Sequence, residues 1–254
     1  MYKSGKPVFD YLSIEGRKTT RLVHNDFNTQ LENTQRLLNA QFATLEQSAW
    51  TYSQRHFSGR RSSEPALISS LHKSVFLFYS AIQLNNQGLY GPARTLLRSI
   101  FEGQVIAKYS MLDHSSSVYE HWSKAKPIHI TNQIFNRIKK PDIGELKYFW
   151  QSMHEMAHAT IYAQQIEVEY PNTKQGIATT LSLIQILLCM NQHLLGRHFL
   201  TNATIRYTRM YSDEEAFEAS RETARQLVKA IRAEFTDSGK RVVREYTASW
   251  KIKN

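Results

Sequence analysis

Apolar residues recur at helical intervals along most of this chain. Residues 26–54 contain no Gly or Pro, and their apolar side chains are spaced by three, four and seven positions. This spacing places them along one face, so the segment predicts one long amphipathic helix. Pro65 opens a second apolar segment, and Gly91 with Pro92 opens a third. Residues 66–111 therefore predict a hairpin of two helices joined by a short turn.

The second half of the chain predicts shorter helices around one uncharged helix. Residues 114–127 and 130–141 each end in a proline and predict short helical segments. Residues 177–195 carry no charge at all, and seven of these 19 residues are polar. The stretch is also at the short end for crossing a bilayer. We therefore expect a central helix that is buried inside the protein.

Capping signals mark two further helices. Asp142 with Glu145 forms a D-x-x-E arrangement, which predicts the start of a helix over roughly 143–168. Ser212 with Glu215 forms the equivalent capping box, which predicts the start of an amphipathic helix near the C-terminus. Both signals depend on a side-chain oxygen that accepts hydrogen bonds from the first backbone amides of a helix.

The whole pattern predicts an all-α protein, built as a single-domain helical bundle of about six to eight helices. Gly and Pro together number 16 of 254 residues, about half the usual share, so the chain has few turns. Residues 1–25 mix Gly, Lys, Ser and Thr and predict an irregular N-terminal arm. Residues 26–254 predict the helical bundle domain. We find no internal repeat and no low-complexity tract that would divide it.

Cysteine usage and the N-terminal pattern bear on the compartment. Cys189 is the one cysteine of the chain, so it forms no internal disulfide and no multi-cysteine zinc module. The first residues lack the apolar run of a secretory signal. These features predict a reducing, cytoplasmic location.

The chain carries a formal net charge of +10. A basic balance favours anionic partners, and it does so most when the charge is concentrated. Here the excess is spread almost evenly over the N-terminal, central and C-terminal parts of the chain. The charge therefore predicts RNA or another anionic partner only as a background property, and we expect no association with a membrane.

One candidate site lies on the helix that follows Pro92. Arg94, Arg98, Glu102 and Tyr109 are separated by steps of four and seven, which return to one face of a helix. Arg98 and Glu102 are spaced to form an ion pair. That pair is either an ordinary helical salt bridge or a device in which Glu102 holds the Arg98 guanidinium to receive a phosphate or carboxylate.

A second candidate site lies near residue 154, where Trp150, His154, His158 and Tyr162 step by four along one predicted helix. The segment HEMAH matches H-E-x-x-H, the spacing with which two histidines bind one zinc ion in metalloproteases. A helical wheel places both histidines beside the apolar face, whereas Glu155 points away from it. Zinc bound by His154 and His158 is therefore one interpretation, and paired or ordinary helix-edge histidines are the others.

The two segments that carry these residues, 80–111 and 148–160, together resemble a widespread group of bacterial helical proteins of unknown function. In that group a helix with an Arg-x3-Glu step is followed by a His-containing segment after an aromatic residue. The group is similar in layout to the HEPN superfamily, which includes metal-independent ribonucleases of toxin and phage-defence systems. The resemblance, centred on Arg98, Glu102 and His158, implies an HEPN-like up-down helical core. It also implies binding or cleavage of RNA by a toxin or phage-defence effector.

The sequence departs from that superfamily in one respect. HEPN ribonucleases carry Arg-x4-6-His on one helix, and here only Arg17 and His24 have such a spacing, which chance explains. A ribonuclease built from this chain would combine Arg and His from separate helices. The candidate catalytic residues are Arg98, Glu102, His154 and His158. The candidate substrate-binding residues are Arg94, Tyr109, Trp150 and Tyr162.

Three functions are thus compatible with the sequence. The first is an HEPN-like protein that binds or cleaves RNA without a cofactor. The second is a non-catalytic helical interaction module, and the third is a zinc-dependent hydrolase that uses the HEMAH segment. A homodimer fits all three, because long amphipathic helices commonly pair.

Overall fold

Every regular element in the computed structural model is helical. The structure describes residues 8–54, 64–113, 117–139, 143–157 and 174–253. The α-helices are α1 (Val8–Asp26), α2 (Asn28–Gln54), α3 (Glu64–Asn86), α4 (Tyr90–Leu112), α5 (Ser117–Ser123), α6 (Gly144–Ala157), α8 (Lys174–His193), α9 (Asn202–Tyr211), α10 (Glu214–Ala233) and α11 (Asp237–Thr247). Two π-helical segments, η1 (Ile130–Ile134) and η3 (Leu194–Phe199), and one 3₁₀ turn, η2 (Phe135–Arg137), complete them. The predicted all-α helical bundle is confirmed.

The long predicted helices occur where the apolar spacing places them. α2 matches the predicted segment 26–54, and α3 and α4 form the predicted hairpin. Gly88, in the turn between them, has φ of 77°, a left-handed conformation that glycine adopts without steric cost. Its amide donates to the carbonyl oxygen of Asn85 at 3.0 Å, which closes the turn.

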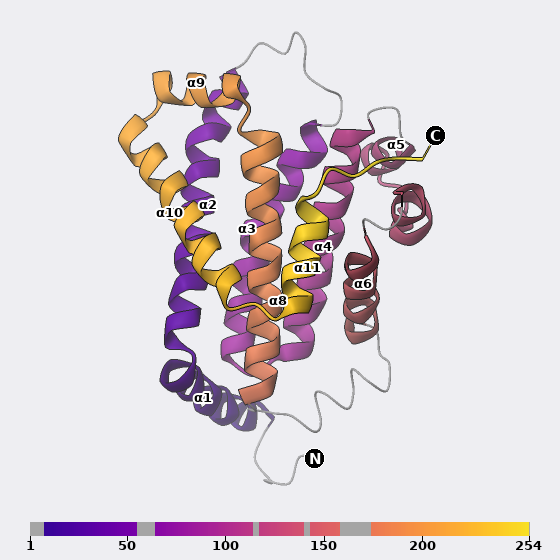
Figure 1. Cartoon of the computed structure of the whole chain (residues 1–254). Coiled ribbons are helices and arrows are strands. Elements are labelled where there is room, and N and C mark those ends of the chain that lie inside the picture. The colour runs from indigo at the N-terminus through magenta and orange to yellow at the C-terminus, as the bar shows by residue number, and fades with distance from the viewer. Residues whose placement is uncertain (1–7, 55–63, 114–116, 140–142, 158–173, 254) are drawn as a thin grey trace.

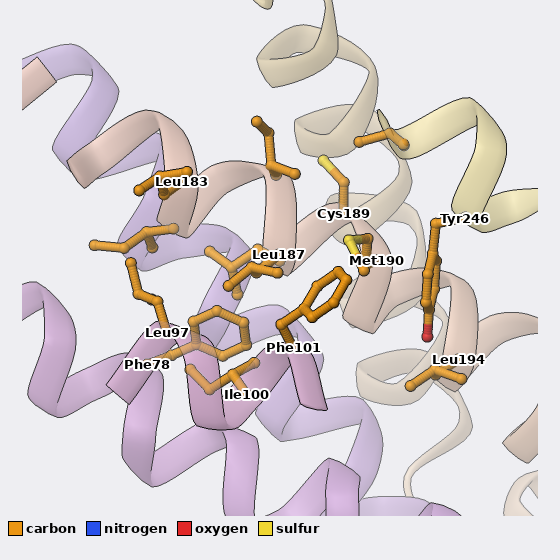
Figure 2. Close-up of a cluster of buried hydrophobic side chains, with 14 of the residues drawn as sticks. Phe78, Leu97, Ile100, Phe101, Leu183, Leu187, Cys189, Met190, Leu194 and Tyr246 are labelled. Atoms are coloured by element: carbon orange, nitrogen blue, oxygen red, sulfur yellow. The ribbon is translucent and has the colours of Figure 1, made fainter. Parts of the chain in front are cut away.

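α8 is the central helix, and its burial confirms the prediction for residues 177–195. It packs against α2, α3, α4, α10 and α11, and it runs through the middle of the bundle in Figure 1. Figure 2 shows Phe78 of α3 and Leu97, Ile100 and Phe101 of α4 meeting Leu183, Leu187 and Met190 of α8. Lys174–Phe199 is long and apolar enough to cross a membrane, yet 72% of its most apolar window is buried inside the bundle.

Polar side chains inside the bundle are tied to the backbone of α8. Gln41 of α2 donates to the carbonyl oxygen of Leu188 at 2.9 Å, and Gln104 of α4 donates to that of Leu187 at 3.0 Å. Asn191 of α8 in turn donates to the Gln41 side chain at 2.9 Å. Because a buried polar group without a partner is costly, these bonds fix which faces of α2, α4 and α8 meet.

Three expectations about individual elements need correction. Residues 8–26 form α1 and not an irregular arm, because Val23 is buried and Thr20 donates to the carbonyl oxygen of Asn86 at 3.0 Å. The cap of α10 is Asp213, whose side chain accepts from the amide of Ala216 at 3.0 Å, and not Ser212. The described residues hold ten α-helices and so exceed the six to eight expected, because short helices such as α9 and α11 form where the sequence pattern predicted no element.

The first turn of α6 is held by α11. The amide of Leu146 donates to a Glu245 carboxylate oxygen at 2.8 Å, and Arg241 forms an ion pair of 2.9 Å with Glu145. The proposed cap Asp142 and the expected helical residues beyond 157 lie outside the described residues. α6 carries half of the candidate site, so these contacts from α11 set its position.

Candidate functional site

A groove of about 420 Å³ opens between α4, α6 and the segment that leads into η1. Its walls include Arg98 and Glu102 of α4 and His154 of α6, three of the four residues predicted as catalytic. The remaining lining residues are Ile128, His129, Ile130, Thr131, Asn132, Trp150, Gln151 and Glu155. Residues that the sequence placed on two separate helices therefore meet at one solvent-reachable surface.

The Arg98 guanidinium is oriented by two contacts within the groove. Its Nε lies 3.0 Å from Oε1 of Glu102, which forms the predicted i,i+4 ion pair. Its Cζ lies 5.3 Å from the centroid of the Trp150 ring on α6. A cation over an indole face is attracted by the ring's negative face. The Arg98 side chain is 22% exposed, so part of it stays accessible to an anion.

Trp150 supports the groove from beneath. It is 7% exposed and stacks on Phe101 of α4, with ring centroids 5.9 Å apart and an interplanar angle of 12°. The His154 ring lies 5.3 Å from it, one helical turn further along α6. An indole so deeply buried has little surface for stacking on a substrate. Trp150 therefore forms a platform under Arg98 and beside His154, and its contact with a substrate stays a prediction.

The outward face of α6 contributes the side chains that reach solvent. His154 and Glu155 are both exposed, whereas the preceding residue, Met153, is 1% exposed. This agrees with the helical wheel, which placed His154 beside the apolar face and Glu155 away from it. The imidazole and carboxylate at this end of α6 thus face the groove and not the core.

His129 is the groove residue that the sequence pattern did not reveal. It directly precedes η1, and its amide donates to Oε1 of Gln133 at 2.6 Å, which fixes the start of this π-helical segment. Its side chain is exposed. A π-helical turn shifts the register of side chains by one residue, so it hides the helical spacing on which a sequence prediction depends. The one available signal was Pro127, two residues upstream.

Two predicted substrate-binding residues lie in the interior and not in the groove. Arg94 is 4% exposed, and its Nε donates to Oγ1 of Thr180 on α8 at 3.3 Å. Tyr109 is fully buried, and its hydroxyl donates to an Asp113 carboxylate oxygen at 3.3 Å. Burial raises the pKa of Tyr109. Both side chains therefore serve packing inside the bundle.

The other two predicted residues, His158 and Tyr162, lie outside the described residues, so half of the HEMAH pair is not placed. Within the described ranges, no three His, Cys, Asp or Glu side chains are grouped closely enough to hold a metal ion. Zinc coordination by His154 and His158 stays a prediction from the sequence.

The strongest pKa shifts lie away from the groove, where α4, α8 and α11 meet. Burial lowers the pKa of Lys108 to about 7. Its Nζ donates to the carbonyl oxygens of Tyr246 and, at 2.8 Å, Ala248, and lies 4.0 Å from the Trp250 ring centroid. Burial, with the nearby charge of Lys108, lowers the pKa of His193 to about 3. Lys108 is 1% exposed, so this cluster anchors the C-terminal end of α11 and presents no reactive amine to solvent.

Comparison with known proteins gives no indication of function, so the functional argument depends on the groove itself. No protein-family model matches the chain, and no curated protein or solved structure matches it. The HEPN-like layout therefore stays an expectation from sequence resemblance.

Proposed function

We propose that this protein binds RNA in the groove between α4 and α6 and cleaves it without a metal ion. The observation that carries the proposal is the arrangement of Arg98, which pairs with Glu102 and lies over Trp150 beside His154. A guanidinium held in this way is suited to a phosphate, because its planar fork matches two phosphate oxygens.

The chemistry follows from the side chains that share the groove. His154 accepts the proton of a ribose 2′-hydroxyl as its oxygen attacks the adjacent phosphorus. Arg98 stabilises the charge that accumulates on the pentavalent phosphate. His129 gives a proton to the departing 5′-oxygen, which leaves a 2′,3′-cyclic phosphate and a 5′-hydroxyl. Imidazole suits both proton transfers, because it exchanges protons near neutral pH.

Two further features support an RNA ligand. The net charge of +10 favours a polyanion, and the resemblance to HEPN proteins points to RNA. In this proposal the chain acts inside the cell as a toxin or phage-defence effector, and its expression arrests growth unless Arg98 is replaced.

Cleavage of a fluorescent single-stranded RNA in EDTA tests the proposal. We expect wild type to cleave it, and Arg98→Ala and His154→Ala each to lower kcat/KM by at least about 100-fold, which is the usual contribution of a group that stabilises transition-state charge or of a general base. His129→Ala is expected to lower kcat and to leave the affinity for RNA unchanged. His24→Ala and Arg21→Ala are the matched controls, because both residues are exposed on α1, and they should cleave at the wild-type rate.

Each other outcome identifies an alternative. Binding without cleavage by wild type would make the protein a non-catalytic interaction module. Activity that appears only with added zinc, and is lost in EDTA, would favour the HEMAH hydrolase. Equal rates for wild type and Arg98→Ala would remove the groove from the mechanism.

A further inference from the structure

A second groove, of about 570 Å³, lies between the end of α10 and α11. α10 and α11 both pack on α8, and the turn that joins them crosses in front of α8 in Figure 1. The groove is lined by Arg232, Ala233, Asp237, Lys240, Arg241 and Arg244. Four of these six side chains are basic and one is acidic, so the lining is far more basic than the chain as a whole.

The sequence of α11 explains why these charges gather. Val242, Val243 and Tyr246 are buried against the bundle, whereas Lys240, Arg241 and Arg244 are exposed to solvent. Residues 240 and 244 are one helical turn apart and share a face. The short turn after α10 brings exposed Arg232 to the same groove.

Three of the four cations keep their charge available to a ligand. Arg241 forms an ion pair of 2.9 Å with Glu145 of α6. Within the described part of the chain, Arg232, Lys240 and Arg244 have no carboxylate partner. Asp237, in the first turn of α11, is the one carboxylate among the lining residues, so the four cations leave a net lining charge of +3.

We infer that this second groove binds phosphate groups of a single-stranded nucleic acid. The inference extends the proposed function, since it gives the RNA a second contact surface. Glu145, which touches this groove through Arg241, and His154 lie nine residues apart on α6, about 14 Å along the helix axis. At about 3.4 Å per nucleotide of one strand, about four nucleotides reach from one groove to the other, so the preferred substrate is an oligonucleotide and not a dinucleotide.

The chemistry of the lining suits the phosphates of a nucleic acid better than a lipid surface. Three of the four cations are arginines, whose planar fork pairs with two phosphate oxygens. Ala233 is the one apolar lining residue, whereas docking on a lipid surface requires large apolar side chains that insert into the membrane.

Salt-dependent binding tests the inference. A triple variant, Arg232→Ala with Lys240→Ala and Arg244→Ala, is compared with wild type on a 30-nucleotide RNA and on oligo(dT) of equal length. The DNA lacks the 2′-hydroxyl and is not cleaved, so it reports phosphate contacts alone. We expect affinity for both to fall about tenfold and the slope of log K against log salt to flatten by about 2, because three phosphate contacts are lost.

The control variant removes the same charge elsewhere: Lys18→Ala, Arg21→Ala and Lys73→Ala, on exposed positions of α1 and α3. It should keep the wild-type slope. An equal slope for the two triple variants, or no binding of either oligonucleotide by wild type, would overturn the inference. The inference would also be overturned if wild type bound poly-glutamate as tightly as it binds RNA and the groove variant lost that binding. Such a result would assign the groove to an acidic polypeptide. If the groove variant shows a flatter salt slope on oligo(dT) but wild type does not cleave RNA, the second groove is upheld and the proposed catalysis is refuted.

Discussion

Glu245 of α11 accepts a hydrogen bond of 2.8 Å from the backbone amide of Leu146, in the first turn of α6. The first amides of a helix have no partner within the helix, so a carboxylate supplied by another helix acts as a cap. The last helix of the chain thus holds the helix that carries Trp150 and His154.

Replacing Glu245 by Ala should lower the free energy of unfolding by about 1–2 kcal/mol, because the amide loses its cap. Urea denaturation measures the change. Glu234→Ala is the matched control, since Glu234 is exposed at the end of α10 and should alter stability by less than about 0.5 kcal/mol. Identical midpoints for the two variants would show that the cap contributes nothing.

Arg98→Lys should weaken RNA binding about tenfold although the positive charge is kept. The lysine ammonium cannot form a two-pronged contact with phosphate, and it loses the contact of the guanidinium with the Trp150 ring. Fluorescence anisotropy with an uncleaved RNA analogue measures the dissociation constant. Lys73→Arg, an exposed substitution on α3, should leave it unchanged. Wild-type affinity for Arg98→Lys would mean that only the charge at residue 98 matters.

Gly176→Ala should destabilise the protein by about 1–3 kcal/mol, because a Cβ at this position would lie 2.6 Å from Cε2 of the Tyr90 ring. Tyr90 is 2% exposed and has no room to move away. Gly144→Ala is the matched control, because its Cβ would meet no atom within 4 Å. It should be neutral or stabilise by up to about 1 kcal/mol, since alanine restricts the unfolded chain. Thermal melts of equal midpoint would contradict the steric argument.

Lys108 should make stability rise with pH above neutrality. Its pKa is about 7 in the folded protein, against 10.5 ordinarily. Below pH 7 both states are protonated, so the contribution is constant. Between about pH 7 and 10.5 the unfolded state binds more protons, so the free energy of unfolding increases by up to about 1.4 kcal/mol per pH unit.

Lys108→Met removes this titration, so wild type should gain stability relative to the variant as pH rises from 7 to 10. Urea denaturation at a series of pH values measures the difference. Lys73→Met, at an exposed position, should follow the wild-type curve in parallel. Parallel curves for Lys108→Met and wild type would show that Lys108 titrates normally.

The parts of the fold that follow from local sequence were predictable. α2 and α4 bury one face and α8 buries most of its surface, and burial imposes the helical spacing of apolar residues. α1 was missed because Gly16 and its neighbouring threonines suggest an irregular segment. In the structure Gly16 packs near the carbonyl oxygen of Gln87, where the helix contacts the α3–α4 turn.

In the candidate site, contacts within one helix were predictable, and contacts between helices were not. The pairs Arg98 with Glu102 and Trp150 with His154 follow from a spacing of four on one helix. The meeting of Arg98 with Trp150 depends on how α4 packs on α6, which no local pattern contains. The burial of Arg94 is likewise decided by α8, 86 residues away along the chain.

The cap that Glu245 provides also orders events during synthesis. Chains emerge from the ribosome N-terminus first, so α4 and α6 are made long before α11. Until residue 245 emerges, the amide of Leu146 lacks its carboxylate partner. The groove of Arg98 and His154 therefore reaches its final shape only after α11 has been synthesised, and a nascent chain stalled before α11 would hold an unfinished site.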